Sequence, residues 1–141
     1  GRVKDTIVLL GGENIEPNPI EENLVQSDYI DQAMVVGQDQ KFLGALIVPN
    51  SEKIEELAKE LGVQYIDKEE LLENEEIKDI IYAEIQNYIN PKRGFKAFER
   101  IFRFRLLANS FEVGNELTRT LKIRRNVVYN KFKREIAELF Q

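Results

Sequence analysis

Cysteine and histidine are both absent from this chain of 141 residues. Without cysteine there are no disulfides and no thiol chemistry. Without histidine, the Ser-His and Cys-His arrangements of nucleophilic enzymes are excluded, and a zinc site lacks its usual ligands. Only carboxylates could hold a metal, as a hard ion, and no Asp-rich loop with calcium spacing occurs. We therefore expect no metal site within the chain.

Long apolar runs are also missing, since none approaches the ~20 residues that cross a bilayer. Hydrophobic residues make up 43% of the chain and charged residues 32%. This composition predicts a folded globular domain, and the length suits one domain with its own core. The sequence starts without Met and passes almost at once into a strand-like stretch. We therefore expect residues 1–141 to form a single domain of a longer protein.

Charge is distributed unevenly along the sequence. The net charge is −5, yet residues 92–134 contain thirteen Lys and Arg against three Glu, a local net charge of +10. The rest of the chain then carries −15. Such a basic third can face an anionic ligand or partner. Ion pairs with the acidic part of the same chain would explain it equally well, so both interpretations stay open.

Apolar periodicity predicts an α+β domain: a small central β-sheet with an N-terminal β-hairpin, covered by helices. Strands are expected over 6–10, 30–37, 42–48, 101–107 and 117–123, with the second and third forming an antiparallel hairpin. Helices are expected over 18–27, 51–61, 68–89 and 124–140. The first should have Asn18 as its N-cap and Pro19 at its first position. Gly62 should end the second.

Two short motifs carry possible chemistry. Gly11, Gly12, Glu13 and Asn14 follow the first strand, and paired glycines can reach positive φ or let a ligand approach the backbone. No phosphate-loop pattern is present, so a plain hairpin turn is the ordinary interpretation. In "ELTRTLKIRRNVV" (116–128), a strand would put Lys122 on one face with Thr118 and Thr120. A lysine among small hydroxyls can contact an anion as a point charge, although a solvated basic face is the commoner arrangement.

A nucleic-acid surface is a second interpretation of the basic third. Four phenylalanines alternate there with basic residues, as on a base-stacking platform: Phe95, Phe98, Phe102 and Phe104 lie among Lys96, Arg100, Arg103 and Arg105. Aromatic residues at this spacing are more often part of a core, and no nucleic-acid motif is present. We therefore expect no nucleic-acid partner, and keep a non-catalytic anion-binding or nucleic-acid-binding module as an alternative.

Taken in order, three stretches resemble the C-terminal domain of the acyl-adenylate-forming enzymes. "GRVKDTIVLLGGENIEPNPIEENL" (1–24) is similar to that family's Gly-Arg, hinge residue, strand, glycine loop and Ile-Glu helix start. "VVGQDQKFLGALIVPN" (35–50) is similar to the next block in long-chain acyl-CoA and acyl-carrier-protein synthetases. "LTRTLKIRRNVV" (117–128) resembles their catalytic-lysine motif. The resemblance covers essentially the whole chain.

The resemblance implies a ligase that activates a fatty acid with ATP and Mg²⁺ to an acyl-adenylate, then transfers the acyl group to CoA. A large N-terminal domain would bind most of the ATP and the acyl chain, and this domain would be a rotating lid. Lys122 would be the adenylation lysine, Lys4 the hinge residue, and Arg2 a contact near the nucleotide. The loop lining the pantetheine path would be formed by Gly11, Gly12, Glu13 and Asn14.

The sequence departs from the family pattern beside the lysine. Leu121 stands where many relatives have Gly, and Arg119 where many have Pro. The resemblance leaves open whether the acceptor is CoA or an acyl carrier protein. It implies a cytoplasmic enzyme, with at most peripheral membrane association, whose lid domain is inactive in isolation.

Overall fold

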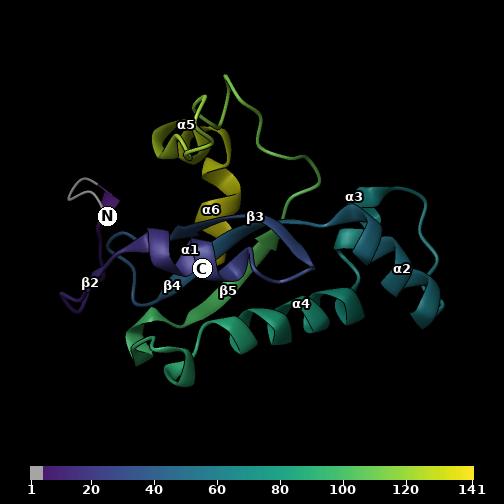
Figure 1. Ribbon diagram of the computed structural model, residues 1–141, viewed down its shortest axis with the longest axis horizontal. Coiled ribbons are helices and arrows are strands. Elements are labelled where there is room, and N and C mark those ends of the chain that lie inside the picture. Colours follow the sequence, from purple (N-terminus) through teal and green to yellow (C-terminus); the bar gives the residue numbers. More distant parts are fainter. Residues whose placement is uncertain (1–4) are drawn as a thin grey trace.

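The computed structural model describes residues 5–141 (Figure 1). Arg2 and Lys4, expected near the nucleotide and at the hinge, lie outside the described residues. In chain order the elements are β1 (Ile7–Val8), β2 (Asn14–Ile15), α1 (Pro17–Leu24), β3 (Ile30–Val36), β4 (Leu43–Pro49), α2 (Ser51–Leu61), α3 (Lys68–Leu72), α4 (Glu75–Tyr88), η2 (Pro91–Arg93), η3 (Ala97–Glu99), β5 (Ile101–Leu106), α5 (Arg125–Lys131) and α6 (Lys133–Leu139). The predicted α+β class is confirmed.

The central sheet has the strand order β3-β4-β5. β3 and β4 form the predicted antiparallel hairpin, and β5 lies parallel to β4, so α2, α3 and α4 make up the crossover between them. β1 and β2 form a separate antiparallel pair in which Ile7 lies opposite Ile15. The N-terminal hairpin is therefore confirmed, although its strands are shorter than the predicted 6–10.

The two faces of the central sheet bury two different cores. Along β3, Ala33 and Val35 belong to one core cluster, whereas Met34 and Val36 belong to the other. The first cluster includes buried residues of α1, α2, α3 and α4, and the second those of α5 and α6. Figure 1 shows α4 along one side of the sheet and α6 on the other. The C-terminal helices therefore hold the preceding segment, 107–124, against the second face.

Helix α2 is formed as predicted because both of its ends are specified locally. The Asn50 side chain accepts a hydrogen bond from the Lys53 backbone N–H (3.1 Å), and Gly62 takes the left-handed conformation, with φ +70°. Ile54 is 2% exposed and faces the core. Burial of one such side chain contributes about 1.5–3 kcal/mol.

Three helix boundaries differ from the prediction. Helix α1 begins at Pro17 and ends at Leu24, because proline at 17 fits the first turn as well as proline at 19 does. The expected helix over 68–89 is two helices, since the Asn74 side chain caps Ile77 N–H and starts a new one. The expected helix over 124–140 is broken at Phe132, which ends α5 and precedes α6.

Candidate functional site

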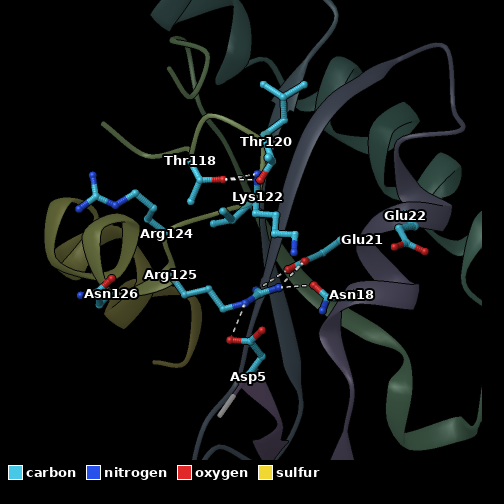
Figure 2. Close-up of a pocket in the computed structure, with 12 residues that line it drawn as sticks. Asp5, Asn18, Glu21, Glu22, Thr118, Thr120, Lys122, Arg124, Arg125 and Asn126 are labelled. Carbon is cyan, nitrogen blue, oxygen red and sulfur yellow. Dashed lines mark hydrogen bonds and ion pairs between the residues drawn. The ribbon is translucent and has the colours of Figure 1, made fainter. Parts of the chain in front are cut away.

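A cleft of about 940 Å³ lies between the segment 118–126 and helix α1 (Figure 2). Lys122 lines one wall, Asn18, Glu21 and Glu22 line the other, and Asp5 lies at one end. The two walls come from opposite ends of the chain. The candidate lysine therefore faces the first helix across a single cleft.

Lys122 lies at the end of a tight turn, so the expected strand over 117–123 is wrong. The Leu121 N–H donates to the Thr118 carbonyl (2.9 Å), and the Thr118 N–H donates to the Lys122 carbonyl (2.8 Å). Leu121 has φ +66°, a left-handed conformation that favours glycine. This explains why a glycine there suits the turn. Because the segment is not a strand, its side chains do not alternate between two faces, and the prediction that Thr118, Thr120 and Lys122 share a strand face is wrong.

The two threonines nevertheless support the turn that carries the lysine. The Thr118 hydroxyl accepts a hydrogen bond from the Lys122 backbone N–H (3.0 Å) and lies 3.1 Å from the Thr120 hydroxyl. Figure 2 shows the Lys122 side chain pointing into the cleft, toward Glu21 and Arg125. Within residues 5–141 its ammonium makes no ion pair. The cleft thus presents an uncommitted positive charge that an anion can reach.

Arg125 joins the two walls at the base of the cleft. Its guanidinium donates two hydrogen bonds to the Glu21 carboxylate (2.7 and 2.8 Å) and one to the Asn18 amide oxygen (2.8 Å), and lies 3.8 Å from Asp5. Val35 N–H donates a further bond to Glu21 (2.7 Å). Asn18 therefore accepts a hydrogen bond from Arg125 and is not the predicted N-cap of α1, a position that Glu16 occupies.

Both members of this pair are mostly buried, with side chains 19% exposed for Arg125 and 8% for Glu21. Burial raises the pKa of the Glu21 carboxyl, although the bonds from Arg125 and Val35 oppose the shift. Burial acts to lower the pKa of Arg125, but its bonds and attraction to Glu21 raise it overall. Arg125 is thus a structural partner inside the domain, and the basic third is neutralised in part by the acidic N-terminal half.

Glu116 is a buried acid, 3% exposed, that the sequence does not distinguish from a surface residue. It accepts hydrogen bonds from Lys131 Nζ (2.5 Å) and from the Glu112 backbone N–H (2.9 Å). Burial acts to raise its pKa, but these bonds outweigh burial and lower the pKa below its ordinary value.

This shift predicts an acid-dependent contribution to stability. A carboxyl with a lowered folded-state pKa stabilises the fold above its unfolded-state pKa, and the contribution is lost as the pH falls through the folded-state pKa. We expect Glu116→Gln to cost on the order of 1 kcal/mol at pH 7. The difference from the parent should shrink as the pH falls below about 4.3, the ordinary pKa of glutamate. Urea unfolding at pH 7 and pH 3 measures this difference in the free energy of unfolding. A difference that does not change with pH would contradict the lowered pKa of Glu116.

The glycine loop lies at the tip of the β1–β2 hairpin. The Leu9 N–H donates to the Glu13 carbonyl (3.0 Å), and the Gly12 N–H donates to the Leu9 carbonyl (2.9 Å). Gly12 has φ +91°, a conformation that L residues rarely adopt. The residues that line the Lys122 cleft do not include 11–14. The structure therefore does not bring the loop and the lysine into one site.

The aromatic residues of the basic third are mostly committed to packing. Phe95, Phe98 and Phe104 pack against the first core cluster. Phe102 is 43% exposed, but the Arg100 guanidinium covers its ring at 4.6 Å from the centroid. A base-stacking platform needs open ring faces, which this arrangement does not offer.

Known proteins identify the domain. The family model of the AMP-binding enzyme C-terminal domain matches residues 4–141. The chain belongs to this family. A probable acyl-activating enzyme 16, chloroplastic, from Arabidopsis thaliana is 38% identical over 143 residues, covering 100% of this chain and 19% of that protein. A long-chain-fatty-acid–CoA ligase 1 from Cavia porcellus is 34% identical over 141 residues, covering 99% of this chain and 20% of that protein.

Solved structures support the same fold for this AMP-binding enzyme C-terminal domain. The adenylation domain of a carboxylate reductase from Mycobacterium chelonae superposes with a TM-score of 0.81 at 20% identity, covering 99% of this chain and 20% of that one. The corresponding domain from Segniliparus rugosus, in complex with AMP and a carboxylic acid, gives 0.80 at 20% identity and the same coverage. The resemblance inferred from the three motifs is confirmed. The chain spans about a fifth of the length of the curated relatives it matches.

Across residues 5–141, no helix is both long and apolar enough to cross a membrane. In the same range, no group of three or more His, Cys, Asp or Glu side chains could hold a metal ion.

Proposed function

We propose that this chain is the lid domain of a long-chain fatty-acid ligase that forms an acyl-adenylate and then a thioester. Its Lys122 acts in the first half-reaction. The observation that carries the proposal is the Lys122 ammonium, which makes no ion pair within residues 5–141 and points into the cleft from a turn braced by Thr118. Relatives at 34–38% identity named as acyl-activating enzyme and fatty-acid ligase supply the reaction class.

The chemistry required of Lys122 is electrostatic. Attack of a carboxylate on the α-phosphorus of ATP brings two anionic groups together and builds charge on the phosphoryl and leaving oxygens. An ammonium placed beside these oxygens stabilises the transition state without transferring a proton. Lysine suits the role because its charge is compact and its side chain long.

ATP, Mg²⁺ and the fatty acid would be bound mainly by the N-terminal domain of the parent protein. Within residues 5–141 the carboxylates do not gather into a metal-binding group, so Mg²⁺ would be held by that domain. Lys122 would complete the nucleotide site from the lid. Lys4 would act as the hinge residue, and Arg2 would contact the nucleotide.

Removal of the lid tests the proposal directly. In the full-length enzyme, deletion of residues 5–141 should abolish fatty-acid-dependent exchange of pyrophosphate into ATP while leaving ATP binding measurable. The isolated 141-residue chain should form no acyl-CoA from ATP, fatty acid and CoA. Undiminished exchange by the lidless enzyme would refute the assignment.

The acceptor of the acyl group is a separate question. One relative, a chloroplastic long-chain-fatty-acid–[acyl-carrier-protein] ligase from Arabidopsis thaliana, is 37% identical over 99% of this chain. We propose CoA as the acceptor and acyl carrier protein as the alternative. Parallel assays of the full-length enzyme with each acceptor distinguish them by their kcat/KM values.

The glycine loop offers a test of the second half-reaction. The atoms nearest to a Cβ at Gly11 would be those of the flexible Glu13 carboxylate, at 2.7 Å, whereas Gly12 is constrained by its positive φ. In the full-length enzyme, Gly11→Leu should slow thioester formation from preformed acyl-adenylate about 10- to 100-fold, because its bulk narrows the pantetheine path. Adenylation should be unaffected.

Gly11→Ala is the matched control for this variant. It introduces the same Cβ contact without the bulk, so it should retain the thioester rate. Equal rates for Gly11→Leu and Gly11→Ala would exclude the loop from the path of the thiol.

A further inference from the structure

Glu116 lies at the base of the loop that carries Lys122. Its side chain is 4% exposed, and it stands immediately before the buried Leu117, where the chain leaves the second core to form the exposed turn. The chain returns at Ile123, which is bridged antiparallel to Leu117. Glu116 thus lies at the base of the loop whose far end carries the lysine.

Both ends of this loop are connected to Glu116. Its backbone carbonyl accepts a hydrogen bond from the Arg124 N–H (2.7 Å), two residues after Lys122. Its carboxylate accepts from the Glu112 N–H (2.9 Å) on the incoming side and from Lys131 Nζ (2.5 Å). One residue therefore joins the incoming chain, the outgoing chain and helix α5.

Lys131 supplies a fixed point for this connection. It lies in the last turn of α5, the helix in which Val128 is fully buried against the second face of the sheet. The turn itself has no such anchor, because Thr118, Thr120 and Leu121 are exposed. The Glu116–Lys131 ion pair joins the base of the loop to the last turn of α5, in addition to the packing of Leu117 and Ile123 and the Arg124 N–H bond to the Glu116 carbonyl.

The carboxylate of this ion pair, and not its lysine, differs from those of the exposed pairs: the Glu116 side chain is 4% exposed, whereas that of Lys131 is 54% exposed. Lys78 lies 3.1 Å from Glu75, a carboxylate whose side chain is 82% exposed, and exposed pairs contribute little. A carboxylate buried as deeply as Glu116 stays fixed only while its partners satisfy it. The Glu116–Lys131 pair therefore constrains geometry in a way that the Lys78 pair cannot.

We propose that Glu116 and Lys131 form a positioning pair that sets the place of the Lys122 ammonium during adenylate formation. The inference rests on the proposed function, because it assigns the pair to the half-reaction in which Lys122 acts. Neither residue contacts substrate. Both act through the lysine, by fixing the base of the turn that carries it.

The test uses the full-length enzyme and separates the two half-reactions. We expect Lys131→Met to lower the rate of adenylate formation about 10- to 100-fold, the loss typical of a misplaced catalytic group. Thioester formation from preformed acyl-adenylate should stay unchanged. Lys131→Arg keeps a cationic donor and should retain most of the parent rate of adenylate formation. Glu116→Gln keeps the acceptor for Glu112 N–H, so its rate of adenylate formation should lie between those of Lys131→Met and the parent. Lys78→Met, which breaks an exposed pair, is the matched control and should leave both rates unchanged.

A double variant distinguishes positioning from general damage to the fold. If Lys131 acts through Lys122, then Lys131→Met should cause no further loss of adenylation in a Lys122→Ala background. Additive losses, or equal losses in both half-reactions, would overturn the positioning role. If Lys131→Met does not fold, the same comparison is made with Glu116→Gln, which changes no side-chain size.

The failure of this inference can be told apart from the failure of the proposed function. If Lys122→Ala alone lowers the rates of both half-reactions equally, the role proposed for Lys122 is wrong, and the positioning role of the pair fails with it. If Lys122→Ala is selective for adenylation while Lys131→Met and Glu116→Gln leave adenylation at the parent rate, only the positioning pair is refuted.

Discussion

Replacement of Lys122 by alanine should lower the rate of adenylate formation by the full-length enzyme about 100- to 1,000-fold, the usual cost of removing one group that stabilises developing charge. Thioester formation from preformed acyl-adenylate should be nearly unaffected, because the rotating lid would present another face, and not Lys122, to the second half-reaction. Rapid-quench measurement of the two half-reactions separates them. The stability of the domain should not change, because the Lys122 side chain is exposed and makes no ion pair within residues 5–141.

Two variants sharpen this result. Arg119→Ala removes one positive charge from the same turn, but Arg119 is not among the residues that line the cleft, so its effect should be small. Lys122→Arg keeps the charge but replaces a compact ammonium by a planar group, so it should recover only part of the rate. If Arg119→Ala were as damaging as Lys122→Ala, net charge and not placement would be the cause.

Arg125→Met should destabilise the 141-residue chain by about 3–5 kcal/mol, because it leaves the Glu21 carboxylate buried without its partner. The Asn18 contact and the proximity to Asp5 are lost at the same time. Urea unfolding followed by circular dichroism measures the change from the shift in midpoint. A loss of this size is a large part of the stability of a typical domain.

A second variant identifies the source of that cost. Glu21→Gln removes the buried charge but keeps an amide oxygen to accept the Val35 N–H. The double variant Glu21→Gln with Arg125→Met should therefore be more stable than Arg125→Met alone. If the double variant were less stable than either single one, the lost packing of the arginine, and not an unpaired carboxylate, would account for the result.

Local features were predictable because their signals are local. Helix α2 is specified within a few residues at each end, by the Asn50 cap and the Gly62 stop, and it is formed as expected, as is the antiparallel hairpin of β3 and β4. The order of three motifs was enough to predict the family. Helix breaks at Asn74 and Phe132 were missed because continued apolar periodicity on both sides hides them.

The arrangement of residues around the cleft could not be predicted from local sequence signals. Arg125 meets Glu21 across 104 positions of sequence, and nothing near either residue specifies that pairing. The basic third indicated only that an acidic partner exists, inside or outside the chain. The turn at Lys122 was mistaken for a strand because Leu121, unlike glycine, gives no sign of a left-handed backbone.

The left-handed backbone of Leu121 affects both the stability and the conformational freedom of the turn. A leucine at φ +66° costs about 1–2 kcal/mol of steric strain that glycine would avoid. Glycine would in turn enlarge the conformational freedom of the unfolded chain, at about 0.4–1 kcal/mol. The strain is the larger of the two terms, so a glycine-bearing turn would be the more stable, by on the order of 1 kcal/mol. The leucine form, however, has fewer alternative backbone conformations, so the turn would have less backbone entropy to lose if Lys122 binds an anion.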